Sequence, residues 1–150
     1  MTIGVEYFLG AHSLAGTWTI RPDGKHIKDS PHRLAKAGKF ANVPLMIGDM
    51  RDEGTLFTQL NHLTVTTESQ FKDYFQKEWF RRATDSDMAE LLRLYPQDPT
   101  KGSPYGTGLL NAITPQYKRI ASLTGDYSFE VSPCLKISLQ GLIEFLGPTP

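Results

Sequence analysis

The sequence has little of what marks several common classes of protein. It contains a single cysteine, Cys134, so no disulfide can form within the chain. Lys plus Arg and Asp plus Glu both number 16, and this balance lacks the basic excess that binding to phosphate backbones requires. No run approaches the roughly 18 apolar residues of a membrane-spanning helix. We therefore expect no disulfide framework, no nucleic-acid partner and no membrane span.

Targeting and metal-binding signals are equally scarce. Residues 1–10 lack a basic start and carry Glu6 inside their apolar run, which makes them a poor signal peptide. Cys134 has no cysteine or histidine at metal-ligand spacing. The apolar share of 39% and the aromatic share of 11% still indicate an ordinary globular chain. Its 150 residues are the length of one domain.

The first half of the chain predicts a turn, a short helix and a buried strand. The tripeptide at 22–24, Pro-Asp-Gly, is a turn signal between two β-prone stretches. Ser30 followed by Pro31 starts a helix that Gly38 ends. The continuous apolar run 43–48 is typical of a strand buried on both faces of a parallel sheet.

The second half predicts helices, the first of which has an aromatic face. Thr67 and Gln70 form a capping box, in which each side chain bonds the other residue's backbone. Phe71, Phe75 and Trp79 follow at the spacing of one helical face. We expect this face to be buried.

Two further helices are expected downstream. One starts at Thr84 and is stopped by Pro96. The next follows the Thr-Pro pair at 114–115 and is expected to end at Gly125 in a left-handed cap. Helical signals weaken after residue 129. We therefore expect one domain over residues 1–129 and a divergent tail over residues 130–150.

Three acidic residues directly after the predicted strand, Asp49, Asp52 and Glu53, are the sharpest chemical feature. One interpretation is a metal site, although no histidine is adjacent and hard cations need more oxygen ligands. A second is a solvated acidic turn without function. A third makes one carboxylate the acid of a nucleophile–base–acid triad, on a loop at the carboxyl end of a strand. The residues alone leave these three open.

A set of motifs across residues 18–129 resembles carboxylesterase type B proteins, most closely the fungal lipases and esterases of that family, which also contains the cholinesterases. The motifs are Arg21-Pro-Asp-Gly24, Gly38-Lys-Phe-Ala-Asn-Val-Pro-Leu-Met-Ile-Gly-Asp49, Asp52-Glu-Gly-Thr55, Tyr95-Pro-Gln-Asp98, Gly102-Ser-Pro104 and Asn111-Ala-Ile-Thr-Pro-Gln-Tyr-Lys-Arg-Ile120. The resemblance implies an α/β fold class. It predicts an incomplete fragment of an α/β-hydrolase fold, with one strand and mostly helical covering segments.

The resemblance also implies an activity and a set of site residues. The family hydrolyses carboxylic esters through a Ser–His–Glu triad, and the glutamate of its Asp-Glu-Gly motif corresponds to Glu53. By analogy with its lipases, the apolar acyl group of the substrate would contact residues after the acid and on the next helix. No metal and no cofactor is implied. The candidates for this substrate-binding pocket, each with plain core packing as the alternative, are Leu56, Phe57, Tyr74, Phe75 and Trp79.

Two members of the triad are absent from these 150 residues. There is no G-x-S-x-G nucleophile motif, and no histidine follows His62. We therefore expect the chain to be inactive alone and to associate with itself through uncovered apolar surface. The alternatives are a non-catalytic, cholinesterase-like binding module and a truncated gene product. Intact fungal members are typically secreted, but the sequence itself assigns no location.

Overall fold

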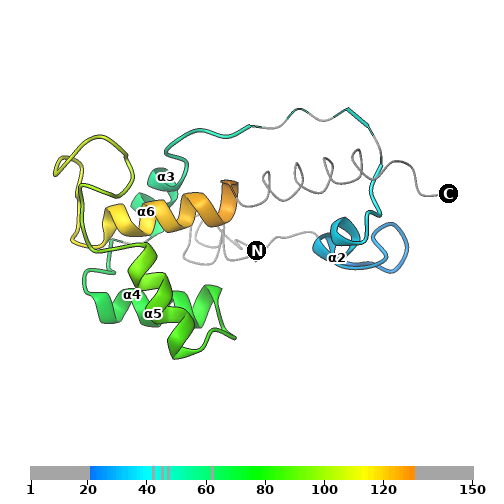
Figure 1. Cartoon of the computed structure of the whole chain (residues 1–150), viewed down its shortest axis with the longest axis horizontal. Coiled ribbons are helices and arrows are strands. Elements are labelled where there is room, and N and C mark those ends of the chain that lie inside the picture. The colour runs from blue at the N-terminus through cyan, green and yellow to red at the C-terminus, as the bar shows by residue number, and fades with distance from the viewer. Residues whose placement is uncertain (1–20, 42, 45, 47, 62, 131–150) are drawn as a thin grey trace, which may run out of the picture.

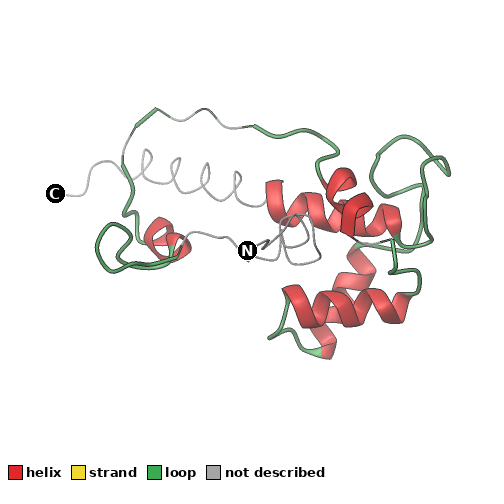
Figure 2. Ribbon diagram, turned by 180° about the vertical axis from the view of Figure 1, so that it is seen from behind, coloured by secondary structure: helices red, strands yellow, loops and turns green. Residues whose placement is uncertain are grey.

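The computed structural model describes residues 21–41, 43, 44, 46, 48–61 and 63–130. Helix α2 (Pro31–Lys36) lies apart from the other helices in both views (Figures 1 and 2). None of the helices in the described part is long and apolar enough to cross a bilayer. The other elements, which include two π-helical turns, are α3 (Gly54–Asn61), α4 (Glu68–Tyr74), η1 (Phe75–Trp79), α5 (Asp85–Leu94), α6 (Tyr117–Gly125) and η2 (Asp126–Glu130).

The predicted strand over residues 43–48 is wrong for the residues of this run that the structure describes. Val43, Pro44, Met46 and Gly48 have neither helical nor strand structure, and Met46 is 98% exposed. Figure 2 shows helices and loops but no strand in the described residues. A parallel strand needs hydrogen-bonding partners on its edges and cover on both faces, and the described residues supply neither. Positions 42, 45 and 47 lie outside the description.

The predicted turn at 22–24 and the short helix after it are present. The Asp23 carboxylate accepts hydrogen bonds from the backbone N–H groups of Lys25, His26 and Ile27 at 2.8–2.9 Å. The bonds from Ile27 and Lys25 are the main cause that lowers the pKa of Asp23 to about 2. Ser30 then caps α2 by accepting from the Arg33 N–H. The β-prone stretch before this turn lies outside the described residues.

The two capping boxes are the clearest match between sequence and structure. The Thr67 hydroxyl accepts from the Gln70 N–H at 3.2 Å, and the Gln70 side chain accepts from the Thr67 N–H at 3.0 Å. Thr84 and Asp87 form the same reciprocal pair at the start of α5. Local hydrogen bonds therefore fix where both helices begin.

Helix α6 ends at Gly125 as predicted, but it begins at Tyr117, later than the threonine–proline pair predicts. The predicted left-handed cap is wrong, because Gly125 has no positive φ and the chain continues into η2. Gly125 instead packs against α3, where an added Cβ atom would lie 3.3 Å from the Gly54 nitrogen. A Cβ atom added to Gly54 would lie 1.9 Å from the Ala121 carbonyl oxygen and 2.6 Å from the Gly125 nitrogen.

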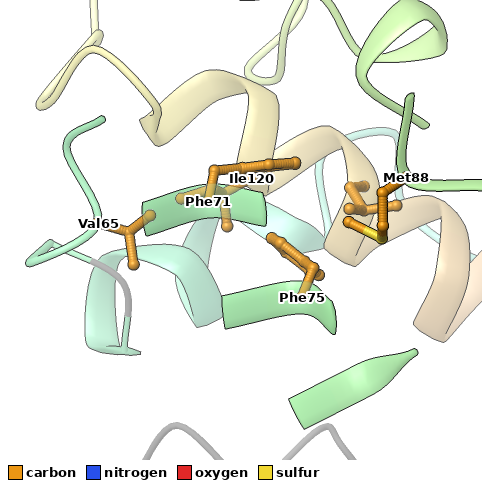
Figure 3. Packing of buried hydrophobic residues seen from close by; sticks show 6 residues of the cluster. Val65, Phe71, Phe75, Met88 and Ile120 are labelled. Atoms are coloured by element: carbon orange, nitrogen blue, oxygen red, sulfur yellow. The ribbon is translucent and has the colours of Figure 1, made fainter. Parts of the chain in front are cut away.

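The core lies between α4, η1, α5 and α6. Phe71 and Phe75 pack with their ring centroids 4.7 Å apart and are fully buried. Figure 3 shows them beside Ile120 of α6 and Met88 of α5. The aromatic face that the sequence predicts for α4 is thus buried, and it continues into η1. This core holds α6 in place beneath the acidic segment that precedes α3.

The buried residue Arg119 links helices α4, α5 and α6. The Arg119 guanidinium on α6 donates to Glu68 of α4 at 3.1 Å and to the Leu92 carbonyl of α5 at 3.3 Å. It also donates to the Tyr95 carbonyl and lies 4.4 Å above the centre of the Phe71 ring. Because these acceptors come from separate elements, Arg119 fixes their relative positions.

Candidate functional site

Glu53 lies at the N-terminal end of α3, one residue before the helix begins. Its Oε1 atom accepts a hydrogen bond from the Met50 N–H at 3.1 Å, and the residue is half-buried. Glu53 also lines a small recess between the acidic segment and α6. Other residues that line the recess are Ser103, Tyr105, Ser122, Gly125, Asp126 and Phe129.

The neighbouring Asp52 is the most connected of the three acidic residues. Its Oδ1 atom accepts from the Ser103 hydroxyl at 2.7 Å and from the Tyr105 N–H at 2.9 Å. Its backbone carbonyl accepts from the Thr55 hydroxyl at 2.7 Å. Asp52 therefore joins the start of α3 to the loop 102–105. Asp49, by contrast, is exposed.

The loop 102–105 is itself held on α6. The Ser103 N–H donates to the Ser122 hydroxyl at 2.9 Å and to the Lys118 carbonyl at 3.2 Å. Gly102 passes so close to α6 that an added Cβ atom would lie 2.6 Å from the Lys118 Cβ. The walls of the Glu53 recess are thus fixed to α6, the most buried of the helices that the structure describes.

The pocket candidates on α3 differ in their surroundings. Leu56 is 57% exposed. Phe57 is half-buried and stacks on Phe129, with ring centroids 5.6 Å apart. Phe129 also lines the recess, so Phe57 packs on one of the residues that form its wall. Both candidates lie on α3, the helix that directly follows Glu53, and only Phe57 packs toward the recess.

The candidates on α4 and η1 form an aromatic cluster of their own. Phe75 is fully buried and packs against Tyr74 and Trp79. The Trp79 indole N–H donates to the Tyr74 hydroxyl at 3.2 Å, and burial raises the pKa of Tyr74 to about 12. Trp79 meets the edge of Tyr127 at 5.2 Å. The cluster therefore reaches η2, two residues before Phe129.

Glu53 gives the recess a group that can accept hydrogen bonds. In the described part of the chain, Glu53 makes no hydrogen bond to a histidine: His26 pairs with Asp23 at 3.2 Å, and His32 is exposed on α2. His12 and His62 lie outside the described residues. Nor do the described residues bring three or more histidine, cysteine or acidic side chains together. A carboxylate in this position can accept an N–H donor and stabilise a positive charge beside it.

Comparison with known proteins shows that the sequence of this chain is similar to fungal lipases. The chain is 50% identical over 117 residues to Lipase 4 of Diutina rugosa, which covers 78% of this chain and 21% of the relative. It is 42% identical over 136 residues to a secreted triacylglycerol lipase of Gibberella zeae, covering 91% of this chain and 23% of that relative. Lipase 2 of Geotrichum candidum is 40% identical over 141 residues, covering 85% and 25% respectively.

The chain thus spans about a fifth to a quarter of the length of these curated relatives. No family model matches it. At this level of identity the chain is homologous to fungal lipases, and the resemblance drawn from its motifs is confirmed.

Proposed function

We propose that this chain, homologous to fungal lipases of the carboxylesterase type B family, is the segment of such an enzyme that supplies the triad acid. The observation that carries the proposal is the position of Glu53. Glu53 lines a recess whose walls are fixed to α6, within a stretch that is 40–50% identical to lipases. In the whole protein this segment would serve the hydrolysis of carboxylic esters with an apolar acyl group.

Glu53 has a defined chemical task in this proposal. It would accept the Nδ1–H of the catalytic histidine, which fixes the ring's tautomer and orientation. It would also stabilise the imidazolium that forms when the histidine takes the serine proton. Both tasks need a carboxylate held in one place, and the Met50 N–H bond together with the α3 N-terminus supports this.

The acyl group would contact residues near this acid. Leu56 has the exposed side chain that direct contact with a ligand requires, and Phe57 packs toward the recess through Phe129. Behind them, the packed rings of Tyr74, Phe75 and Trp79 would support the pocket. Phe75 has no exposed surface, so its proposed contribution is to support the pocket wall.

The 150 residues on their own are proposed to be inactive toward esters. They contain neither a G-x-S-x-G motif nor a histidine after His62, so the carboxylate has no nucleophile and base to act through. Purified chain incubated with short and long acyl p-nitrophenyl esters should release product at the background rate. A turnover that survives repurification and disappears in Glu53→Gln would contradict this part of the proposal.

Self-association is proposed for the same reason. Several large apolar side chains are exposed, and in a complete enzyme other segments would cover them. Sedimentation velocity of the purified chain should show oligomers, and a strictly monomeric sample would contradict this. The exposed side chains in the described residues are Phe40, Val43, Met46, Met50, Leu56, Leu63, Leu94, Leu109, Leu110, Ile113 and Tyr127.

A chimeric enzyme tests the acid directly. Residues 18–129 would replace the matching segment of Lipase 4 of Diutina rugosa, the relative that is 50% identical. We expect the chimera to hydrolyse tributyrin and Glu53→Gln to lower kcat by at least a thousandfold, because the histidine loses its orienting charge. Glu90→Gln is the matched control, since Glu90 lies on the exposed face of α5 and pairs only locally with Arg93 at 2.7 Å.

The outcome separates the competing interpretations of the acidic residues. Full activity in Glu53→Gln together with loss in Asp49→Asn or Asp52→Asn would assign the acid elsewhere. Equal loss in Glu53→Gln and Glu90→Gln would indicate general damage to the chimera.

A further inference from the structure

The residue before the proposed acid has hydrogen bonds that a solvated turn would not need. Asp52 Oδ1 accepts from both the Ser103 hydroxyl, at 2.7 Å, and the Tyr105 N–H, at 2.9 Å. Its partners are distant along the chain, 51 and 53 residues away. Charge-assisted bonds of this length are strong ones. They hold together two segments that chain connectivity leaves independent.

The partners of Asp52 are also walls of the recess that Glu53 faces. Ser103 and Tyr105 both line it. Ser103 is 1% exposed and is bonded in turn to Ser122 of α6, which lines the recess as well. A continuous series of hydrogen bonds therefore runs from Asp52 through Ser103 to α6, and Glu53 follows Asp52 directly in the chain.

From this arrangement we propose that Asp52 is a positioning residue for the reaction, which clamps the loop 102–105 and so holds the Glu53 carboxylate at the distance its histidine requires. The inference rests on the proposed function of Glu53. In this role Asp52 acts at a distance from the reacting atoms, since its Oδ1 atom accepts from Ser103 and Tyr105. It acts by fixing the backbone from which Glu53 projects and the wall that Glu53 faces.

The expected effect follows from how a triad uses its acid. An acid displaced by about 1 Å still leaves the substrate pocket intact but weakens the alignment of the histidine, which can cost about a hundredfold in rate. Loss of the clamp should therefore lower kcat and leave KM unchanged, as for an interaction made only in the transition state. A simple loss of folded protein would instead reduce the number of active sites.

The test uses the same chimera, with the active sites counted by the end point of titration with diethyl p-nitrophenyl phosphate. Per active site, we expect Asp52→Ala to lower kcat by ten- to a hundredfold with KM for tributyrin within twofold. Asp52→Asn keeps an Oδ1 acceptor for both donors, so it should recover most of the lost rate. Ser103→Ala removes one of the two bonds and should have an intermediate effect.

Asp98→Ala is the matched control. Asp98 also accepts from one hydroxyl and one backbone N–H through Oδ1, both from Thr100, but it does not line the Glu53 recess. It should keep kcat within twofold.

The outcomes distinguish this inference from the function on which it rests. If Glu53→Gln abolishes activity but Asp52→Ala retains kcat per active site, the positioning role is overturned and the triad acid stands. An Asp52→Ala loss that appears only as fewer titratable sites, or as a raised KM, also overturns it. If Glu53→Gln itself is fully active, the proposed function has failed.

Discussion

Residues 67–125 and residues 21–53 are built on different principles. The first stretch buries its apolar side chains within itself: Phe71, Phe75, Met88 and Ile120 form one core with hardly any exposed surface. The second stretch has a well-capped helix and a well-formed turn, but none of its described residues is buried. Good local signals are therefore present in both, and tertiary burial in only one.

The contrast shows what each kind of signal can do alone. A capping box or an aspartate-bonded turn closes its hydrogen bonds within a few residues, so it forms wherever the chain carries it. A strand closes its hydrogen bonds only on a neighbour. The run 43–48 has the composition of a buried strand, but its described residues Val43, Pro44, Met46 and Gly48 are exposed and form no strand, because the described residues offer no sheet to join.

Truncation of the core should give the largest difference between the two stretches. Phe75→Ala should lower the free energy of unfolding by about 3–5 kcal/mol, since it leaves a cavity among fully buried neighbours. Met46→Ala, at a side chain that is 98% exposed, should change it by less than about 0.5 kcal/mol. Urea unfolding followed by far-ultraviolet circular dichroism measures both. Similar losses at the two sites would mean that the run 43–48 is buried in solution.

The crossing of α3 and α6 should be the next most sensitive feature. Gly54→Ala places a methyl group against the Ala121 carbonyl, so we expect a loss of about 1–3 kcal/mol as the helices move apart. Gly48→Ala is the matched change in the exposed run, where an added Cβ atom has no neighbour within 4 Å. It should be neutral. An unchanged urea midpoint for Gly54→Ala would refute the close crossing.

Removal of a helix cap in each of the two stretches should change stability less than the substitutions above. Thr84→Ala removes the hydroxyl that accepts from the Asp87 N–H, and should lower the free energy of unfolding by about 1 kcal/mol. Ser30→Ala removes an equivalent bond to the Arg33 N–H. Because α2 buries no residue, loss of this hydrogen bond should unfold α2 locally and leave the urea midpoint of global unfolding unchanged. Amide hydrogen exchange within α2 and α5 distinguishes local from global opening.

The smallest expected effect is on pH dependence. The pKa of Asp87 is lowered in the folded state, first by the Thr84 hydroxyl and then by the Thr84 N–H. A lowered folded pKa means that Asp87 stabilises the fold above its unfolded pKa, and that this contribution is lost as pH falls through the folded pKa. Asp87→Asn should therefore flatten the decline in stability below about pH 4. Asp23→Asn should leave the decline unchanged although hydrogen bonds lower the pKa of Asp23 to about 2, because the turn 22–27 contains no buried residue and can open without unfolding the core.

The sequence was sufficient for those features whose physical cause is local. The sequence predicts helix starts at Ser30, Thr67 and Thr84, and at Thr67 it also predicts the partner of the cap, because Gln70 is three residues away. The aromatic face of α4 is predictable because its period matches a helix. Helix α6 ends at Gly125 as predicted, but the left-handed cap predicted there is wrong, since a glycine at a helix end has two uses, a left-handed cap and close packing. Only its contact with Gly54 distinguishes them.

The candidate site divides in the same way. The acidic residues in 49–53 can be identified in the sequence as a local cluster, and the family motif identifies Glu53 among them. The clamp made by Asp52 could not be predicted, because Ser103 lies 51 residues away and neither residue is unusual by itself. The resemblance had placed both residues in motifs, at 52–55 and 102–104, without indicating that the two motifs meet. The two motifs meet because both segments pack against α6.

The position of Glu53 relative to a histidine is the most direct test of the central claim that this segment carries a triad acid. A crystal structure of the chimera with Lipase 4 of Diutina rugosa would give the distance between the Glu53 carboxylate and the imidazole of the scaffold's catalytic histidine. We predict an oxygen of Glu53 within about 2.6–3.2 Å of Nδ1, with Asp52 still bonded to Ser103 and Tyr105. An imidazole held by Asp49 or Asp52, or a Glu53 carboxylate beyond hydrogen-bond reach of the ring, would contradict the account.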